Sequence, residues 1–328
     1  MAQFRKLFAE NGQRLTLRWT FVWRIVATAG LLFVLWKALG RDGKNLSDVW
    51  QSVGFHVTRG EGVWLLVLLV LVPVNWALES RKWQLLVGKV QRITFSEAVG
   101  STLAGLLSGL ALPAQIGDVV GRVAALKVAS RSSAIGAALI SGGIQFYAAV
   151  FTGIWGAFEL WEVLPATGPA KKMVAAALGV IVLAGVLAFA FRKYLVLKLP
   201  GNGIWGRVKS SLAVIALYDN AELLTAFAIG LLRYLTYAGQ FVAGLLLFGF
   251  PMSVPEMAAC VSLVLMVKTV LPALNLLGDL GLRGVSAVLI FGIFGIAPDD
   301  VLAVTFLIWA TNILFPAVFG WFWVWKRA

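Results

Sequence analysis

The sequence predicts an all-α integral membrane protein: an inverted repeat with six full transmembrane helices and two re-entrant broken-helix hairpins. Apolar residues make up 60% of the 328 residues and charged residues only 13%, against roughly 45–50% and about 25% in an ordinary soluble domain. Six long apolar segments could each cross a bilayer, and two more are interrupted by proline, glycine and polar residues. This composition excludes a soluble globular enzyme, a disordered chain and a secreted disulfide scaffold.

The six full crossings follow from length, because a spanning helix needs about 20 mostly apolar residues. The segments are Trp19–Leu39, Gly62–Glu79, Ser133–Leu160, Met173–Phe191, Ala221–Phe250 and Val301–Trp325. We expect residues 1–328 to form a single membrane domain. Residues 19–160 would be its first inverted repeat and residues 173–325 its second.

Two apolar segments are expected to enter the membrane and return on the same side. Glu97–Val128 is interrupted at Leu112–Asp118, and Glu256–Ile296 at Leu271–Pro272 and again at Asn275–Gly281. Irregular backbone at membrane depth is stable only where protein or a water-filled cavity covers it. Each segment therefore predicts two half-helices joined by a tip inside the protein.

The two interrupted segments share one pattern. A glutamate stands 16 positions before a proline. A Gly-Asp pair follows the proline, and an arginine follows four residues after the aspartate. The positions are Glu97, Pro113, Gly117, Asp118 and Arg122 in the first segment, and Glu256, Pro272, Gly278, Asp279 and Arg283 in the second. Three crossings per half is an odd number, so the halves would have opposite orientations. Such inverted repeats, interrupted at matching positions, are typical of transporters with a site near the midplane.

The distribution of Lys and Arg predicts that both termini are cytoplasmic. With both interrupted segments re-entrant, sixteen basic residues fall on the cytoplasmic side and five on the outer side, as the positive-inside rule requires. The cytoplasmic residues are Arg5, Lys6, Arg14, Arg18, Arg81, Lys82, Lys89, Arg92, Arg131, Arg192, Lys193, Lys198, Arg207, Lys209, Lys326 and Arg327. The outer residues are Arg41, Lys44, Arg59, Lys171 and Lys172. The segment Gly203–Tyr218 is expected to lie along the cytoplasmic interface.

The matched tips supply four candidate substrate-binding residues. Asp118 and Arg122 lie four residues apart, so they share a helix face and can pair, as Asp279 and Arg283 can. The alternative is that each pair only caps and neutralises its half-helix. A charge at the membrane centre costs about 2.5–3.5 kcal/mol on insertion scales, which favours a polar cavity that receives a charged headgroup. Arginine can bind its phosphate bidentately.

Two further residues could line a substrate path. Arg233 lies near the middle of a long apolar segment, and Lys268 lies just before Pro272 at the second tip. Simpler functions are expected of other polar residues. Helix capping is expected of Glu97, Glu256, Asp299 and Asp300, and interhelical hydrogen bonding of Asn75, Gln145, Asn275 and Asn312.

Nothing in the sequence indicates catalysis, a cofactor or a metal site. One cysteine, Cys260, cannot form an intramolecular disulfide, and one histidine, His56, cannot build a His-rich metal site. The P-loop and nucleophile-elbow patterns are absent. The net charge of +13 is attributed to contacts with anionic lipid headgroups, not to nucleic acid.

The run Leu112–Arg122 resembles the Pro…Gly-Asp/Glu…Arg signature of the lysylphosphatidylglycerol synthase transmembrane (flippase-like) family. The run Leu271–Gly284 is similar to a second block of that family, and the resemblance covers roughly residues 20–325. It implies a bacterial cytoplasmic membrane protein that moves or supplies lipids. Two departures are evident. Gly284 stands where the family has a glutamate after the arginine, and no aminoacyl-transferase domain precedes Ala328, so lysyl transfer is not expected.

The sequence therefore predicts a lipid flippase or transporter without enzymatic activity. An anionic or glycosylated lipid would cross through a midplane polar cavity, with Arg122 and Arg283 binding phosphate. Two alternatives remain open at this stage: a non-transporting accessory to a lipid-synthesis or glycosyltransferase enzyme, and a small-anion secondary transporter.

Overall fold

The structure is a computed structural model that describes residues 62–111, 114–165, 167–271 and 276–327. Every regular element within these residues is helical. The elements are α3 (Gly62–Val87), α4 (Phe95–Ala111), α5 (Ala114–Ala124), α6 (Arg131–Glu159), α7 (Gly168–Ala190), α8 (Arg192–Lys198), α9 (Gly203–Leu212), η2 (Ala213–Leu217), α10 (Asn220–Leu247), α11 (Val254–Val270), α12 (Leu276–Gly292), α13 (Pro298–Trp309), the π-helical turn η3 (Ala310–Leu314) and α14 (Phe315–Arg327).

Five helical stretches among the described residues are long and apolar enough to cross a membrane. They are Gly62–Val87, Arg131–Glu159, Gly168–Ala190, Asn220–Leu247 and Pro298–Phe322. These correspond to five of the six predicted crossings, with ends that differ by a few residues. The sixth, Trp19–Leu39, lies outside the described residues. The largest difference is in α3, which continues to Val87 where the sequence predicted an end at Glu79.

Local signals explain where several helices begin. Asp219 and Glu222 form a capping box at the start of α10, and Ser253 and Glu256 form another at the start of α11. These boxes satisfy backbone N–H groups that have no partner within the helix. Hydrogen bonds from Ser253 also lower the pKa of the Glu256 carboxyl at the start of α11. Capping is thus confirmed for Glu256.

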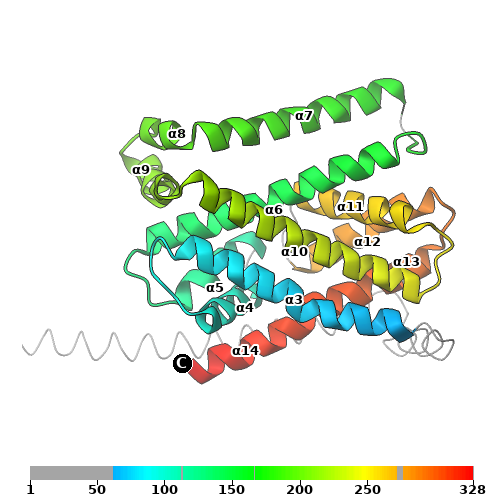
Figure 1. Ribbon diagram of the computed structural model, residues 1–328, viewed down its shortest axis with the longest axis horizontal. Helices are drawn as coiled ribbons and strands as arrows, with labels where there is room; N and C mark the ends of the chain where they lie inside the picture. The colour runs from blue at the N-terminus through cyan, green and yellow to red at the C-terminus, as the bar shows by residue number, and fades with distance from the viewer. Residues whose placement is uncertain (1–61, 112–113, 166, 272–275, 328) are drawn as a thin grey trace, which may run out of the picture.

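The long helices form an elongated bundle (Figure 1). α10 packs along α3, and α6 packs against both α10 and α11. The pair α4–α5 lies toward the end where α3 finishes and α10 starts, and the pair α11–α12 lies toward the opposite end. α7 runs along the outside of the bundle, with no buried residue.

α4 and α5 pack against each other as an antiparallel pair of short helices. They contain 17 and 11 residues, so at 1.5 Å per residue they are about 25 and 16 Å long, shorter than a hydrocarbon core of about 30 Å. Glycines allow the close approach. A Cβ on Gly121 would lie 2.4 Å from the Ala104 carbonyl oxygen, and one on Gly117 would lie 2.4 Å from that of Ser108.

Candidate functional site

A cluster of buried charges lies where α3, α5, α6 and α10 meet. Glu79 on α3 is at its centre, and its carboxylate is 2.8 Å from Lys82 Nζ, 2.8 Å from Arg122 Nη1 and 3.2 Å from Arg233 Nε. The side chains of Glu79 and Lys82 are only 3% and 1% exposed. Three cations from three helices therefore share one buried carboxylate.

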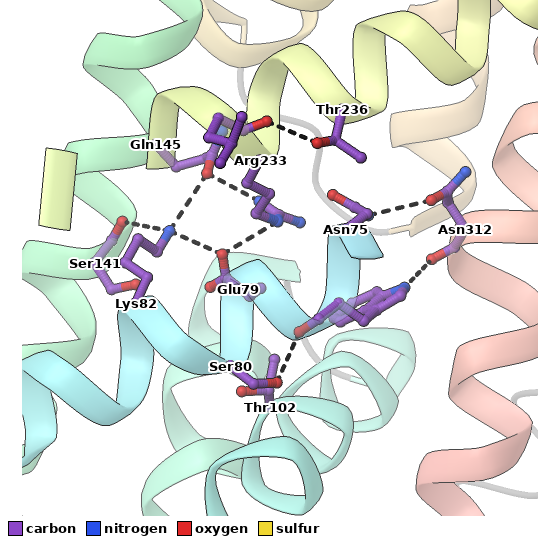
Figure 2. Close-up of polar contacts among 12 residues, drawn as sticks. Asn75, Glu79, Ser80, Lys82, Thr102, Ser141, Gln145, Arg233, Thr236 and Asn312 are labelled. Atoms are coloured by element: carbon purple, nitrogen blue, oxygen red, sulfur yellow. Dashed lines mark hydrogen bonds and ion pairs between the residues drawn. The ribbon is translucent and has the colours of Figure 1, made fainter. Parts of the chain in front are cut away.

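Polar groups of α6 complete the surroundings of Lys82 and Arg233 (Figure 2). Lys82 Nζ donates to the Ser141 carbonyl and to Gln145 Oε1, each at 3.3 Å. Arg233 Nη1 donates to the same Gln145 oxygen at 2.9 Å. The predicted interhelical function of Gln145 is therefore confirmed, and its partners are charged.

Arg122 connects this cluster to the first predicted tip. Its Nε lies 2.9 Å from the Asp118 carboxylate, one turn earlier on α5. The guanidinium carbon also lies 5.7 Å from the centre of the Trp83 ring, which favours a cation through the ring quadrupole. Asp118 is less enclosed than its partner, with 36% of its side chain exposed.

A second cluster forms between α11, α12 and α10. The Asp279 carboxylate is 2.8 Å from Arg283 Nε and 3.0 Å from Lys268 Nζ. Arg283 also donates to the Tyr237 hydroxyl, and its guanidinium carbon lies 5.3 Å from the Tyr237 ring centre. The side chain of Lys268 is 26% exposed.

α10 connects the two clusters. Arg233 belongs to the first and Tyr237 to the second, and the two residues lie one helical turn apart. The described clusters contain five cations and three carboxylates, and so carry an excess of two positive charges. The cations are Lys82, Arg122, Arg233, Lys268 and Arg283, and the carboxylates belong to Glu79, Asp118 and Asp279.

All six residues singled out from the sequence lie in these clusters. The predicted pairs form in α5 and α12, and Arg233 and Lys268 join one cluster each. Whether these residues bind a substrate stays a prediction. Sequence reasoning missed Glu79, Lys82 and Tyr237. The signal available for the first two was their spacing of three residues, next to an apolar continuation of the helix at Trp83–Val87.

The position of Lys82 differs from the one predicted from the distribution of basic residues. The sequence predicts that Lys82 lies at the cytoplasmic surface, but its ammonium is buried inside the bundle. Removing it leaves fifteen basic residues against five, so the asymmetry persists.

A buried hydrogen bond outside the two clusters also holds α3 against the rest of the bundle. Asn75 Nδ2 donates to Asn312 Oδ1 at 3.1 Å, which confirms the interhelical bonding expected of both residues. Asn275 lies outside the described residues. Asn312 belongs to the π-helical turn η3, and its carbonyl oxygen accepts a hydrogen bond from Trp76 Nε1 at 3.1 Å.

The fold and these clusters define a polytopic helical membrane protein with charged groups enclosed among its helices. The family described as the lysylphosphatidylglycerol synthase TM region matches residues 21–320. The chain belongs to this family, which links it to lipid handling in a membrane. A search of curated proteins found no match. The searched, described part of the chain holds no group of three or more His, Cys, Asp or Glu side chains arranged to bind a metal ion.

Proposed function

We propose that this protein moves a lipid with an anionic headgroup across the bacterial cytoplasmic membrane. The observation that carries the proposal is the pair of cation-rich clusters enclosed in an apolar helical bundle. Intramembrane charges are costly and commonly mark the path of a substrate. The excess of two positive charges favours a phosphate-containing headgroup over a neutral or cationic one.

The partly exposed members of the clusters are the first groups that a headgroup would meet. Among the described cluster residues, Asp118 has the most exposed side chain of the three carboxylates, and Lys268 has the most exposed side chain of the five cations. Arg122 and Arg283 would then bind phosphate by exchanging part of their contact with aspartate. Because Glu79 remains beside Lys82 and Arg233, the first cluster can release Arg122 without losing its central carboxylate.

The predicted inverted repeat would give this site a route to both leaflets. In our proposal, α4–α5 enters from the cytoplasmic side and α11–α12 from the outer side. The positions of the two pairs at opposite ends of the bundle (Figure 1) support this arrangement. The sequence pattern shared by the two tips also supports it. Movement of one half of the protein against the other would then expose the clusters alternately to the two sides of the membrane.

Movement of fluorescent phosphatidylglycerol in vesicles containing only the purified protein tests the proposal. Lipid labelled in the inner leaflet should become accessible to a membrane-impermeant reductant in protein-containing vesicles and stay protected in protein-free ones. If the purified protein moves no lipid, the proposal fails and an accessory function beside a lipid-modifying or glycosyltransferase enzyme takes its place. Flux of small anions without lipid movement would indicate an anion transporter.

The double variant Asp118→Asn with Arg122→Gln tests the site itself. Removing one partner of a buried pair lowers the free energy of unfolding by about 3–5 kcal/mol. A single variant could therefore lose lipid movement only because it is less stable. The double variant removes both charges and leaves Glu79 beside two cations. We expect it to fold, with a thermal midpoint near the native one, and to lose lipid movement. A stable and active double variant would contradict the assignment, and Asp279→Asn with Arg283→Gln gives the matched test at the second tip.

A further inference from the structure

A strongly basic segment follows α7. It consists of α8, the connection to α9, α9 itself and η2, and spans residues 192–217; we call it the basic segment. It contains five basic residues and no acidic residue. The basic residues are Arg192, Lys193, Lys198, Arg207 and Lys209.

Three of these cations face outward. The side chains of Lys193, Lys198 and Arg207 are exposed, and none of the three forms an ion pair within the described part of the chain. Lys89 gives a contrast at another exposed position, because its ammonium is 2.7 Å from Glu222. The positive charge of the basic segment is therefore not neutralised by its own protein surface.

Large apolar and aromatic side chains are exposed beside these charges. Tyr194, Leu197 and Trp205 each expose more than half of their surface. Lys198 Nζ lies 5.4 Å from the centre of the Tyr194 ring. A helical segment that combines exposed Lys or Arg with Tyr, Trp and Leu is typical of the membrane interface, where the rings lie among headgroups.

Buried contacts fix the basic segment to the bundle. Arg192 is buried, and its guanidinium donates to the Phe189 carbonyl at 2.8 Å and to Asn220 Oδ1 at 2.6 Å. At the other end, Val214 is buried, and a Cβ on Gly136 of α6 would lie only 1.9 Å from the Ser211 carbonyl oxygen. The exposed cations are thus held in place beside the helices that contain the first charge cluster.

We infer that the basic segment binds the anionic headgroups of the leaflet in which it lies and concentrates them at the protein surface. The occupant is a lipid surface because the cations stand beside exposed aromatic and aliphatic side chains, which a soluble anion would leave in water. A juxtamembrane basic cluster attracts anionic lipid through several additive charges. This surface is separate from the buried clusters, so the inference goes beyond lipid movement through the bundle.

Site-directed quenching in nanodiscs tests the inference. A bimane label is attached at Asn202→Cys, an exposed position within the basic segment, while the buried Cys260 stays unlabelled. Nanodiscs of phosphatidylcholine contain a small fraction of either phosphatidylglycerol or phosphatidylcholine that carries a spin label near the headgroup. We expect several-fold stronger quenching by labelled phosphatidylglycerol, and a decrease in this preference as salt is added.

The variant Lys193→Gln, Lys198→Gln and Arg207→Gln should abolish the preference, since each basic residue near the surface changes the affinity for anionic lipid by about fivefold. The matched control Lys171→Gln with Lys172→Gln removes cations at the far end of α7 and should keep the preference. Equal quenching by both lipids in the native protein, or an unchanged preference in the triple variant, would overturn the inference. The double variant Asp118→Asn with Arg122→Gln should also keep it, so the two proposals fail independently.

Discussion

Glu79 is the residue on which the first charge cluster depends. Lys82, Arg122 and Arg233 approach it from three different helices and within 3.2 Å. Buried cations that share one anion repel one another once that anion is removed, and the desolvation of each is no longer offset. The geometry thus gives Glu79 a stabilising function in addition to any function in transport.

We predict that Glu79→Gln lowers the free energy of unfolding by about 3–5 kcal/mol, because it leaves the three buried cations without their common carboxylate. Thermal unfolding in detergent measures the effect. Arg81→Gln is the control, since Arg81 lies on the exposed face of the same helix, and it should change stability by less than about 0.5 kcal/mol. Adding Lys82→Met to Glu79→Gln should recover part of the loss. A Glu79→Gln protein as stable as the native one would contradict the prediction.

At the scale of elements, the contact between α4 and α5 leaves no room for a side chain at Gly121. We predict that Gly121→Ala separates the two helices, since the new Cβ would lie 2.4 Å from the Ala104 carbonyl oxygen and 2.8 Å from the Gly105 Cα. Overpacking of this kind costs about 1–3 kcal/mol. Lipid movement should decrease as well, because Asp118 and Arg122 are carried by α5.

Gly281→Ala on α12 is the matched control for this substitution. No atom lies within 4 Å of a Cβ built on Gly281, and alanine has the higher helix propensity. Thermal unfolding of both variants should therefore show a loss for Gly121→Ala and no loss for Gly281→Ala. Equal stability of the two variants would show that α4 and α5 do not pack as described.

The π-helical turn η3 lies between α13 and α14 and forms a hydrogen bond with α3. Trp76 Nε1 donates to the Asn312 carbonyl in this turn. The centre of the Trp76 ring lies 5.9 Å from the Arg233 guanidinium carbon. We predict that Trp76→Phe, which removes the N–H donor but keeps an aromatic ring, lowers stability by about 1–3 kcal/mol, because the Asn312 carbonyl loses a partner. Thermal unfolding measures this, with the exposed Trp205→Phe as control. Equal midpoints for the two variants would contradict it.

At the scale of the whole molecule, α10 runs between the two ends of the bundle and separates the basic segment from the start of α11 (Figure 1). We predict that a cysteine at Asn202 reacts with impermeant maleimide only from the cytoplasmic side and one at Met252 only from the outer side. Intact and permeabilised cells distinguish the two. A Met252→Cys protein labelled only from the cytoplasm would contradict the proposed topology.

The sequence by itself determined the class of protein and most of the long helices. Hydropathy and length are local properties, so five predicted crossings correspond to helices in the structure. The pairs Asp118–Arg122 and Asp279–Arg283 could also be predicted, because residues four apart on a helix share a face. The inverted repeat, inferred from the matched pattern, remains a prediction.

Only the tertiary structure determined that Glu79 and Lys82 are buried. The run of polar residues at the end of the apolar segment predicted that the helix stops at Glu79 and that Lys82 faces the cytoplasm. In the structure the helix continues, and both side chains are buried. Their partners Arg122 and Arg233 lie far along the chain. A charge is buried only where an opposite charge and hydrogen-bonding groups meet it, and hydropathy within one segment contains no information about such distant partners.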